Sequence, residues 1–264
     1  MCSRFLSISL LIVAVAVGAS AQLRVCADPD NLPFSNRAEH GFENRIAYLL
    51  AREMHTSVEY TWQRMGRGFV REVLNKHHCD VLLGVPENFR GVATTIPYYR
   101  STYVFVSRRD RRLQLASFDQ PQLKHLKIGV QVLSEEYAPP AQALGRRGLV
   151  SNLVGFETTG GRTSSIIDAV AHKRIDAAVV WGPSAGYFAK KYPSQLQLTP
   201  TPSFDRPGVT LAFSISMGVR KDDTQLRDRL NRLVQTHAAA IHRILISYGV
   251  PLLPQSQHRE VAGE

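Results

Sequence analysis

Residues 23–34 read LRVCADPDNLPF and set the organisation of the chain. The first five residues are typical of a short buried strand, and the two prolines with their Asp/Asn cluster force that strand to open into a loop. Strand and helix patterns then alternate, because apolar residues recur at helical spacing after Gly41 and in buried runs further on. The elements are expected at residues 42–54 (helix), 58–62 (strand), 68–77 (helix) and 79–85 (strand). This βαβαβ order predicts a parallel sheet that binds ligands beyond the carboxyl ends of its strands.

The same alternation begins again after residue 126, which predicts a second sheet. Its elements are expected at residues 127–130, 135–147, 153–157, 164–172 and 175–181. A strand at 211–219 and a helix at 224–246 follow, and a helix so late in the chain must cover a sheet that already exists. If it covers the first sheet, the middle module is an insertion and two strands cross between lobes, near residues 102–108 and 208–215. We therefore predict an α/β protein of two lobes, with two parallel-core sheets flanked by helices and a hinged cleft between them. Lobe 1 is expected at 22–107 plus 210–264, and lobe 2 at 108–209.

The first 21 residues have the features of a cleavable signal peptide. Arg4 precedes an apolar run of 12 residues, and Ala19-Ser20-Ala21 supplies the small-residue cleavage pattern. An uncleaved anchor is the alternative, although the run is shorter than the roughly 20 residues that cross a bilayer. We expect an exported, periplasmic protein with no stable membrane insertion.

The chain has 44% hydrophobic and 20% charged residues, which is typical of a globular protein and excludes a wholly disordered one. Cleavage removes Arg4 from 32 basic residues against 22 acidic ones, so the mature chain carries a net charge of +9. No basic stripe with interleaved aromatic residues is present, so a nucleic-acid partner is not expected. The basic run 108–112 is either a solvated connector or an arm that docks on an acidic partner.

Two cysteines, Cys26 and Cys79, remain after cleavage. An even pair in an oxidising compartment favours a disulfide, while free thiols are the alternative. The pair would lie on neighbouring strands if the first and third strands flank each other. We expect no metal site, because Asp28 and Asp30 are the only suggestive pair of acids and are better explained as residues that shape their loop.

Several runs resemble the two-lobed solute-binding proteins of ABC transporters, family 3 type, which have the type II periplasmic-binding fold. The general frame is Asp-Pro-x-x-x-Pro-Phe at 28–34, Gly-Phe-Glu at 41–43 and Pro-Tyr-Tyr at 97–99. Within that family the chain is similar to the MoxJ/XoxJ type, which is associated with PQQ-dependent quinoprotein alcohol dehydrogenases. The runs that carry this resemblance include 23–29, 67–71, 84–86, 97–105, 180–183, 185–189, 216–220 and 248–252.

The chain departs from the amino-acid-binding relatives at both charged clamps. Those relatives grip the ligand carboxylate with an arginine, where this chain has Asn88 in register and Arg90 two residues away. They hold the ammonium group with an aspartate, where this chain has Gly182 and Pro183 after Trp181. An α-amino acid is therefore not the expected ligand.

The expected cleft residues combine flat aromatic faces with polar and basic groups at strand ends and helix starts. Core packing is the alternative for the aromatic residues, and an ordinary Ser/Thr helix cap is the alternative to an anion site at residues 158–165. A tricarboxylated quinone such as PQQ would use Arg100, Arg162 and Trp181 together, and no other cofactor is expected. The expected ligand- or partner-binding residues are Asn31, Phe34, Trp62, Pro86, Tyr99, Arg100, Arg162 and Trp181.

No nucleophile or metal motif of an enzyme is present in the sequence. A few proteins of this fold are lyases or dehydratases, for which Glu43 or Glu87 would be the proton shuttle if it faced the cleft. We expect no catalytic activity. The resemblance implies a protein of methanol oxidation that assists maturation or activation of a PQQ-dependent methanol or alcohol dehydrogenase. It would do so by binding the enzyme or its cofactor in the interlobe cleft, with that enzyme or its cytochrome as partner. The alternative is a receptor that delivers a small non-amino-acid solute to an ABC permease.

Overall fold

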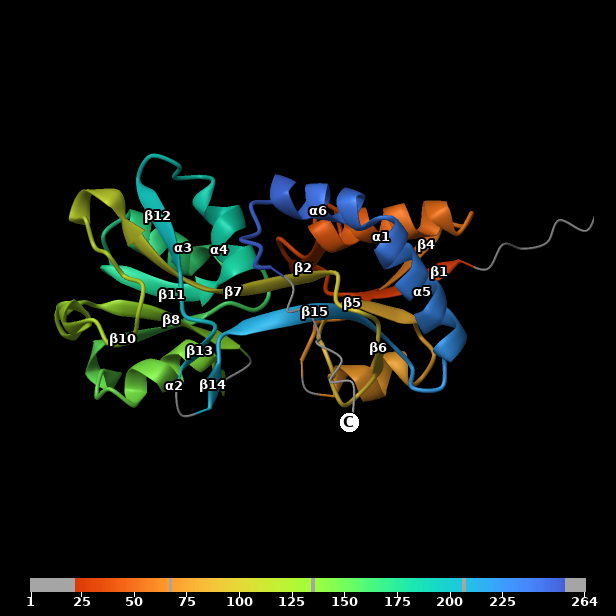
Figure 1. The fold of residues 1–264 in the computed structure, drawn as a ribbon, viewed down its shortest axis with the longest axis horizontal. Coiled ribbons are helices and arrows are strands. Elements are labelled where there is room, and N and C mark those ends of the chain that lie inside the picture. The colour runs from red at the N-terminus through yellow and green to blue at the C-terminus, as the bar shows by residue number, and fades with distance from the viewer. Residues whose placement is uncertain (1–21, 67, 134–135, 206–207, 255–264) are drawn as a thin grey trace, which may run out of the picture.

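The computed structural model describes residues 22–66, 68–133, 136–205 and 208–254. The predicted signal peptide, residues 1–21, lies outside this range. A curled mixed sheet runs through both lobes in the strand order β10-β8-β11-β7-β15-β5-β1-β4, and helices flank it on both sides (Figure 1). The two-lobed α/β fold is therefore confirmed, with the two predicted sheets joined into one.

The first lobe contains the βαβαβ unit that residues 23–86 predict. Strands β1 and β4 pair in parallel, as do β1 and β5, and β1 lies between the other two. The helix that closes the chain lies over this lobe beside α1, as expected, but it breaks into two at His237 (φ −107°, ψ 17°). The main elements are β1 (Leu23–Ala27), α1 (Phe42–Glu53), β4 (Val58–Trp62), a π-helix (Val70–Leu74), β5 (Val81–Pro86), α5 (Thr224–Thr236) and α6 (Ala238–Ser247), with short strands β2 (Asp30–Asn31), β3 (Ser35–Asn36) and β6 (Ala93–Thr94).

The second lobe repeats the alternation around its own parallel strands. Its main elements are β8 (Ile128–Leu133), α2 (Pro139–Gly145), β10 (Leu153–Glu157), α3 (Ser164–Ala171), β11 (Ala177–Trp181), α4 (Gly182–Ala189) and β12 (Leu196–Pro200), with short strands β9 (Glu136–Tyr137), β13 (Phe204–Asp205) and β14 (Val209–Thr210). Helix α2 begins at Pro139 rather than at residue 135, because a proline fits the first turn of a helix but not its interior. Helix α4 was not predicted, since its Gly-Pro start reads as a loop.

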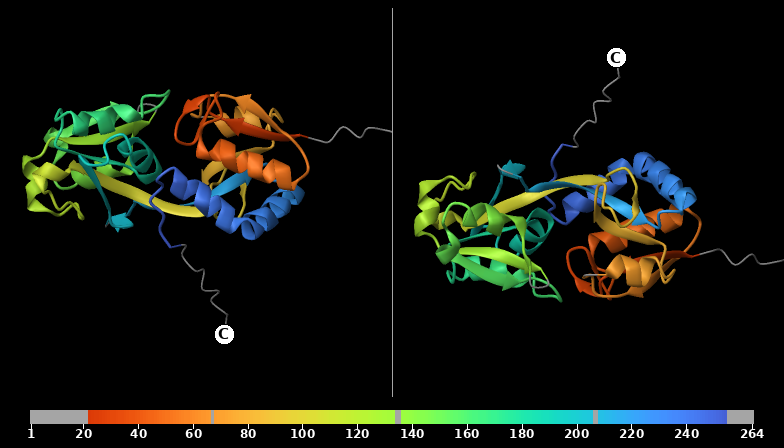
Figure 2. Two further views of the ribbon diagram at one scale, coloured as in Figure 1. Left: turned by 90° about the horizontal axis from the view of Figure 1, so that it is seen from above. Right: turned by 90° about the horizontal axis from the view of Figure 1, so that it is seen from below.

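Two long strands connect the lobes, as the sequence predicts. Strand β7 (Tyr99–Arg108) pairs through its first residues with β15 (Ala212–Val219) and through its later ones with β11 and β12. Figures 1 and 2 show β7 and β15 passing from one lobe to the other. Each lobe has its own apolar clusters, including one around Phe42 and Leu50 in the first lobe and one around Phe105 and Ile128 in the second.

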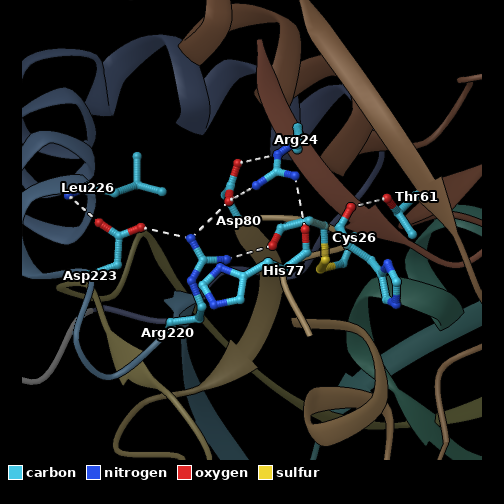
Figure 3. Close-up of polar contacts among 10 residues, drawn as sticks. Arg24, Cys26, Thr61, His77, Asp80, Arg220, Asp223 and Leu226 are labelled. Carbon is cyan, nitrogen blue, oxygen red and sulfur yellow. Dashed lines mark hydrogen bonds and ion pairs between the residues drawn. A yellow bond between two sulfur atoms is a disulfide. The ribbon is translucent and has the colours of Figure 1, made fainter. Parts of the chain in front are cut away.

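A disulfide and a partly buried ion network connect strands of the first lobe (Figure 3). Cys26 in β1 and Cys79 just before β5 form the disulfide, with Cα atoms 5.4 Å apart. Beside it, the carboxylate of Asp80 accepts hydrogen bonds from Arg24 at 2.7 and 2.8 Å and from Arg220 at 2.9 Å. Burial alone would raise the pKa of Asp80, but the bonds from the two arginines outweigh it and hold that pKa below its ordinary value.

The same network reaches the C-terminal helices. Arg220, which follows β15, also bonds Asp223 at 3.1 Å, and Asp223 accepts a bond from the Leu226 amide at 3.2 Å to cap α5. Strands β1, β5 and β15 are thereby joined to helix α5 on the side of the lobe that carries its core.

Candidate ligand site between the lobes

A cavity of about 420 Å³ lies where the two lobes meet, which is within the size range of small-ligand sites. Its walls come from the loop after β1, the start of α1, the end of β5, both connecting strands and the second-lobe strands. Five aromatic rings lie among them, and Trp181 is packed edge-on to Tyr103 and Phe213 at centroid distances of 5.3 and 5.8 Å. The lining residues are Asn31, Phe34, Glu43, Met65, Gly84, Pro86, Tyr99, Tyr103, Gln131, Leu133, Pro139, Thr158, Thr163, Trp181, Ser184, Phe213 and Ile215.

The second lobe contributes a hydrogen-bonded polar wall. The Gln131 side-chain oxygen accepts a bond from the Trp181 amide at 2.7 Å, and the amide group of Gln131 donates to the Thr158 hydroxyl at 3.3 Å. The Thr163 hydroxyl donates to the Thr158 carbonyl at 2.6 Å. Thr163 therefore does not cap helix α3 through its side chain, as the helix-cap alternative required. These bonds hold Trp181 and the two threonines in place at the cavity.

The first lobe contributes one carboxyl group. Glu43 lies in the first turn of α1 and is only 6% exposed, yet it lines the cavity. Burial, with a smaller contribution from the nearby charge of Asp28, raises the pKa of Glu43 to about 8. Asp28 itself accepts hydrogen bonds from the amides of Asp30 and Met65, both at 2.9 Å, so it shapes the loop as predicted.

The lobes also touch directly beside this cavity. The Gly161 amide donates a hydrogen bond to the Asp30 carbonyl at 2.8 Å, which joins the turn before α3 to β2. Gly161 has φ +77°, and a Cβ atom there would lie about 2.5 Å from the Asp30 carboxylate. Glycine is needed at this position because both the backbone angle and the close approach exclude other side chains.

Five of the eight residues predicted for ligand or partner binding line the cavity, and three do not. Asn31, Phe34, Pro86, Tyr99 and Trp181 are brought together there from four different elements or loops of the chain. The other three, Trp62, Arg100 and Arg162, are held elsewhere by contacts of their own.

Local contacts account for the positions of these three residues outside the cavity. The Trp62 ring stacks on Tyr60 at 4.6 Å. Arg100 follows Tyr99 in β7 and so points to the opposite face of the strand, where its guanidinium donates to the Ser203 hydroxyl and the Pro254 carbonyl at 3.4 Å. Arg162 is exposed and donates to the Thr159 carbonyl at 3.3 Å. A role of these residues in binding a partner stays a prediction.

Several lining residues were not predicted. Tyr103 lies in the middle of β7 and Phe213 near the start of β15, where a sequence alone does not tell a cavity wall from a core position. Gln131 carried a usable signal, because an amide side chain within the buried strand β8 has to find polar partners. The sequence suggests Glu43 and Glu87 only as proton shuttles of an enzyme. Glu43 lines the cavity, whereas Glu87 does not.

No arginine, lysine or histidine is among the described residues that line the cavity. Asn88 and Arg90, at the position of the carboxylate clamp, lie outside it, and Gly182 and Pro183 begin helix α4 behind Trp181. No group of three or more residues able to hold a metal ion occurs in the part of the chain that the structure describes. Its helices, over the same residues, are too short or too polar to span a bilayer.

The fold and this interlobe site define a binding protein of the periplasmic type, and comparison with known proteins gives the family. Residues 23–246 match the bacterial extracellular solute-binding proteins, family 3, and the chain belongs to this family. Among curated proteins, it is 32% identical to MoxJ of Methylorubrum extorquens over 89% of this chain and 82% of that protein.

Two crystal structures place it in the MoxJ/XoxJ-like branch. MxaJ of Methlophaga aminisulfidivorans superposes with a TM-score of 0.76 at 29% identity, over 88% of this chain and all of that one. XoxJ of Methylobacterium extorquens has a TM-score of 0.73 at 35% identity, over 88% of this chain and 99% of that one. The branch predicted from the sequence runs is thus confirmed.

Proposed function

We propose that this chain is a non-catalytic periplasmic protein that associates with a PQQ-dependent methanol or alcohol dehydrogenase and assists its maturation or activation. The observation that carries the proposal is its similarity to MoxJ along nearly the whole chain. The cavity supports it, because it lacks both charged clamps for an amino acid and has mainly apolar and aromatic walls. Such walls suit a protruding segment of a partner protein. The two lobes would close about β7 and β15. Their bounds are residues 22–107 with 210–264 for the first lobe and residues 108–209 for the second.

A basic groove gives the partner a second place to dock. It lies between helices α1 and α6, has a volume of about 770 Å³, and contains three exposed arginines, Arg45, Arg52 and Arg243. Tyr48 and Tyr248 supply aromatic surface beside them. A positive patch on a chain of net charge +9 would steer an acidic enzyme to this face.

The cavity does not fit PQQ itself. Three carboxylates need basic groups, but the described lining residues include none, and Glu43 would repel an anion when it is ionised. Arg100 and Arg162, the two bases expected to hold the quinone, lie away from the cavity. We therefore propose the enzyme itself as the partner, and we do not propose that the cavity binds its PQQ cofactor.

Catalysis by the chain is not part of this proposal. The lining side chains that titrate are Glu43 and two tyrosines, Tyr99 and Tyr103, whose pKa values burial raises above the ordinary range. A lyase needs a base as well as an acid near neutral pH, and the described wall supplies no second group of that kind.

Retention of a purified PQQ-dependent methanol dehydrogenase by the immobilised mature protein tests the docking face. We expect binding that weakens as salt is raised from low to moderate concentration, because screening reduces attraction between exposed charges. Charge reversal at Arg45→Glu with Arg243→Glu should lower the affinity at low salt by about tenfold. The control reverses Lys124 and Lys127, exposed on the other lobe, and should change it much less. Equal losses in both variants, or no retention of the dehydrogenase, would contradict the proposal.

A second function, delivery of a small solute to an ABC permease, is favoured by one specific observation. The cavity has the volume of a small-molecule site and the lobes already meet at the bond between Gly161 and Asp30. Recovery of a permease, or of a bound small molecule without any dehydrogenase, from periplasmic extract would favour this function.

A further inference from the structure

The wall of the interlobe cavity has an unusual combination of groups. It offers the rings of Phe34, Tyr99, Tyr103, Trp181 and Phe213, one carboxyl group, and no basic side chain among the residues that the structure describes. Aromatic faces carry a negative quadrupole and attract cations, most strongly in a site from which water is excluded. A carboxylate at the same wall adds a full negative charge. Both features select against anions.

The Glu43 carboxyl group is built into this wall. It is 94% buried, and no donor in the described part of the chain forms a hydrogen bond with it. Gly84 in β5 leaves the space that the group occupies, since a Cβ atom on Gly84 would overlap the Glu43 Oε1 atom. Burying a carboxyl group without a hydrogen-bond or charge partner costs free energy. A ligand group that pairs with Glu43 from within the cavity would therefore bind favourably.

We propose that the interlobe cavity binds a small organic cation, an alkylated or aryl ammonium compound without an anionic group, which places its charge between Glu43 and the aromatic rings. The apolar part of the ligand packs against the rings and against Met65, Leu133 and Ile215. The Gln131, Thr158 and Ser184 side chains of the second lobe are positioned to accept hydrogen bonds from a hydroxyl or N–H group. This inference concerns the cavity alone, and a partner segment that entered the same cavity would compete with the cation for its walls.

The affinity should depend on pH, because the ligand requires the ionised carboxylate. The titratable groups that act on Glu43 or feel its charge are Asp28 after β1, Tyr60 of β4, and Tyr98 and Tyr99 at the start of β7. None of these groups is basic, so no described residue that interacts with Glu43 supplies a positive charge. With a pKa of about 8 in the free protein, Glu43 loses a proton when the cation binds below that pH. The affinity then rises about tenfold from pH 6 to 7 and about fivefold from pH 7 to 8, and it levels off above pH 8.

Calorimetric titration of the mature protein with tetramethylammonium, choline and benzyltrimethylammonium tests the proposal. The neutral probe is 3,3-dimethyl-1-butanol, which has the shape of choline without its charge. We expect at least one cation to bind, the neutral probe to bind at least tenfold more weakly than choline at pH 8, and about one proton to be released per cation at pH 6.5. Buffers of different ionisation enthalpy measure that release.

Two variants locate the site. Glu43→Gln keeps the shape but removes the charge, so the affinity should fall by about 100-fold at pH 8 and lose its pH dependence. Glu59→Gln removes the same charge from the exposed side of β4 and should change neither. Trp181→Leu should weaken binding by about tenfold, with thermal unfolding used to check that the variant folds. Absence of binding by all three cations, equal binding of the neutral probe, or an unchanged affinity of Glu43→Gln would overturn the proposal.

Discussion

Replacing Glu43 with glutamine is expected to stabilise the protein increasingly as the pH rises. In the unfolded chain a glutamate ionises near pH 4.3, whereas in the folded protein the pKa of Glu43 is raised to about 8 by burial and by Asp28. The folded state therefore keeps a proton that the unfolded state loses, and the stability present below pH 4.3 is lost as the pH rises toward 8. Glutamine has no such ionisation. The difference in unfolding free energy between variant and parent should grow by about 3 kcal/mol from pH 4 to pH 7.

Urea denaturation of ligand-free protein at pH 4, 5, 6, 7 and 8 measures this difference. Glu59→Gln, at an exposed position, serves as control and should differ from the parent by a nearly constant amount over the same range. A difference for Glu43→Gln that is flat with pH would show that the carboxyl ionises in the folded protein at its ordinary pKa. That result would also contradict the burial of the Glu43 carboxyl group in the cavity wall, on which the proposed cation site depends.

Removing the disulfide is expected to have an effect of similar size in the opposite direction. Cys26 and Cys79 are 53 residues apart, and closing a loop of that length lowers the entropy of the unfolded chain by an amount worth about 4 kcal/mol. The bond ties β1 to the entry of β5 at the site where Asp80 pairs with Arg24 and Arg220. The double variant Cys26→Ala with Cys79→Ala should lose about this much stability at pH 7.

Denaturation of the parent protein with and without reductant separates the cross-link from the cavity that two alanines leave. Both cysteines are at most 1% exposed, so reduction has to occur through the unfolded state. We expect the reduced parent and the double variant to unfold at similar, lower urea concentrations. Unfolding at the same urea concentration before and after reduction would contradict the stabilising role of this bond.

Much of the architecture could be predicted because local patterns and global topology agree. The buried run at 23–27 followed by two prolines fixes both a strand and a loop at its carboxyl end, and the structure has β1 and the cavity residues Asn31 and Phe34 there. A helix near 224–246, late in the chain, has to cover a sheet that already exists. If that sheet is the first one, two strands must connect the lobes, and the sequence predicts them for this reason. The break at His237 was missed because α5 and α6 both turn apolar residues toward the same core, so the helical spacing continues across it.

The site was less predictable, because its walls are decided by side-chain direction and by contacts between distant segments. Tyr99 and Arg100 are neighbours in one strand and point to opposite faces, so only one of them can reach the cavity. Trp62 ends β4 as Trp181 ends β11, but Trp62 stacks on its own strand neighbour Tyr60. The role of Glu43 depends on a glycine 41 positions later, Gly84, which leaves the space for the carboxyl group. No local pattern could predict that pairing.

We propose above all that this chain assists a PQQ-dependent methanol or alcohol dehydrogenase. The most direct test is the dehydrogenase activity per mole of enzyme in periplasm from source cells that lack the chain, compared with cells that keep it. We predict a lower specific activity without the chain, restored by the parent protein and less well by the Arg45→Glu, Arg243→Glu variant. An unchanged specific activity in cells that have lost the uptake of a small solute would contradict the claim and assign the protein to transport.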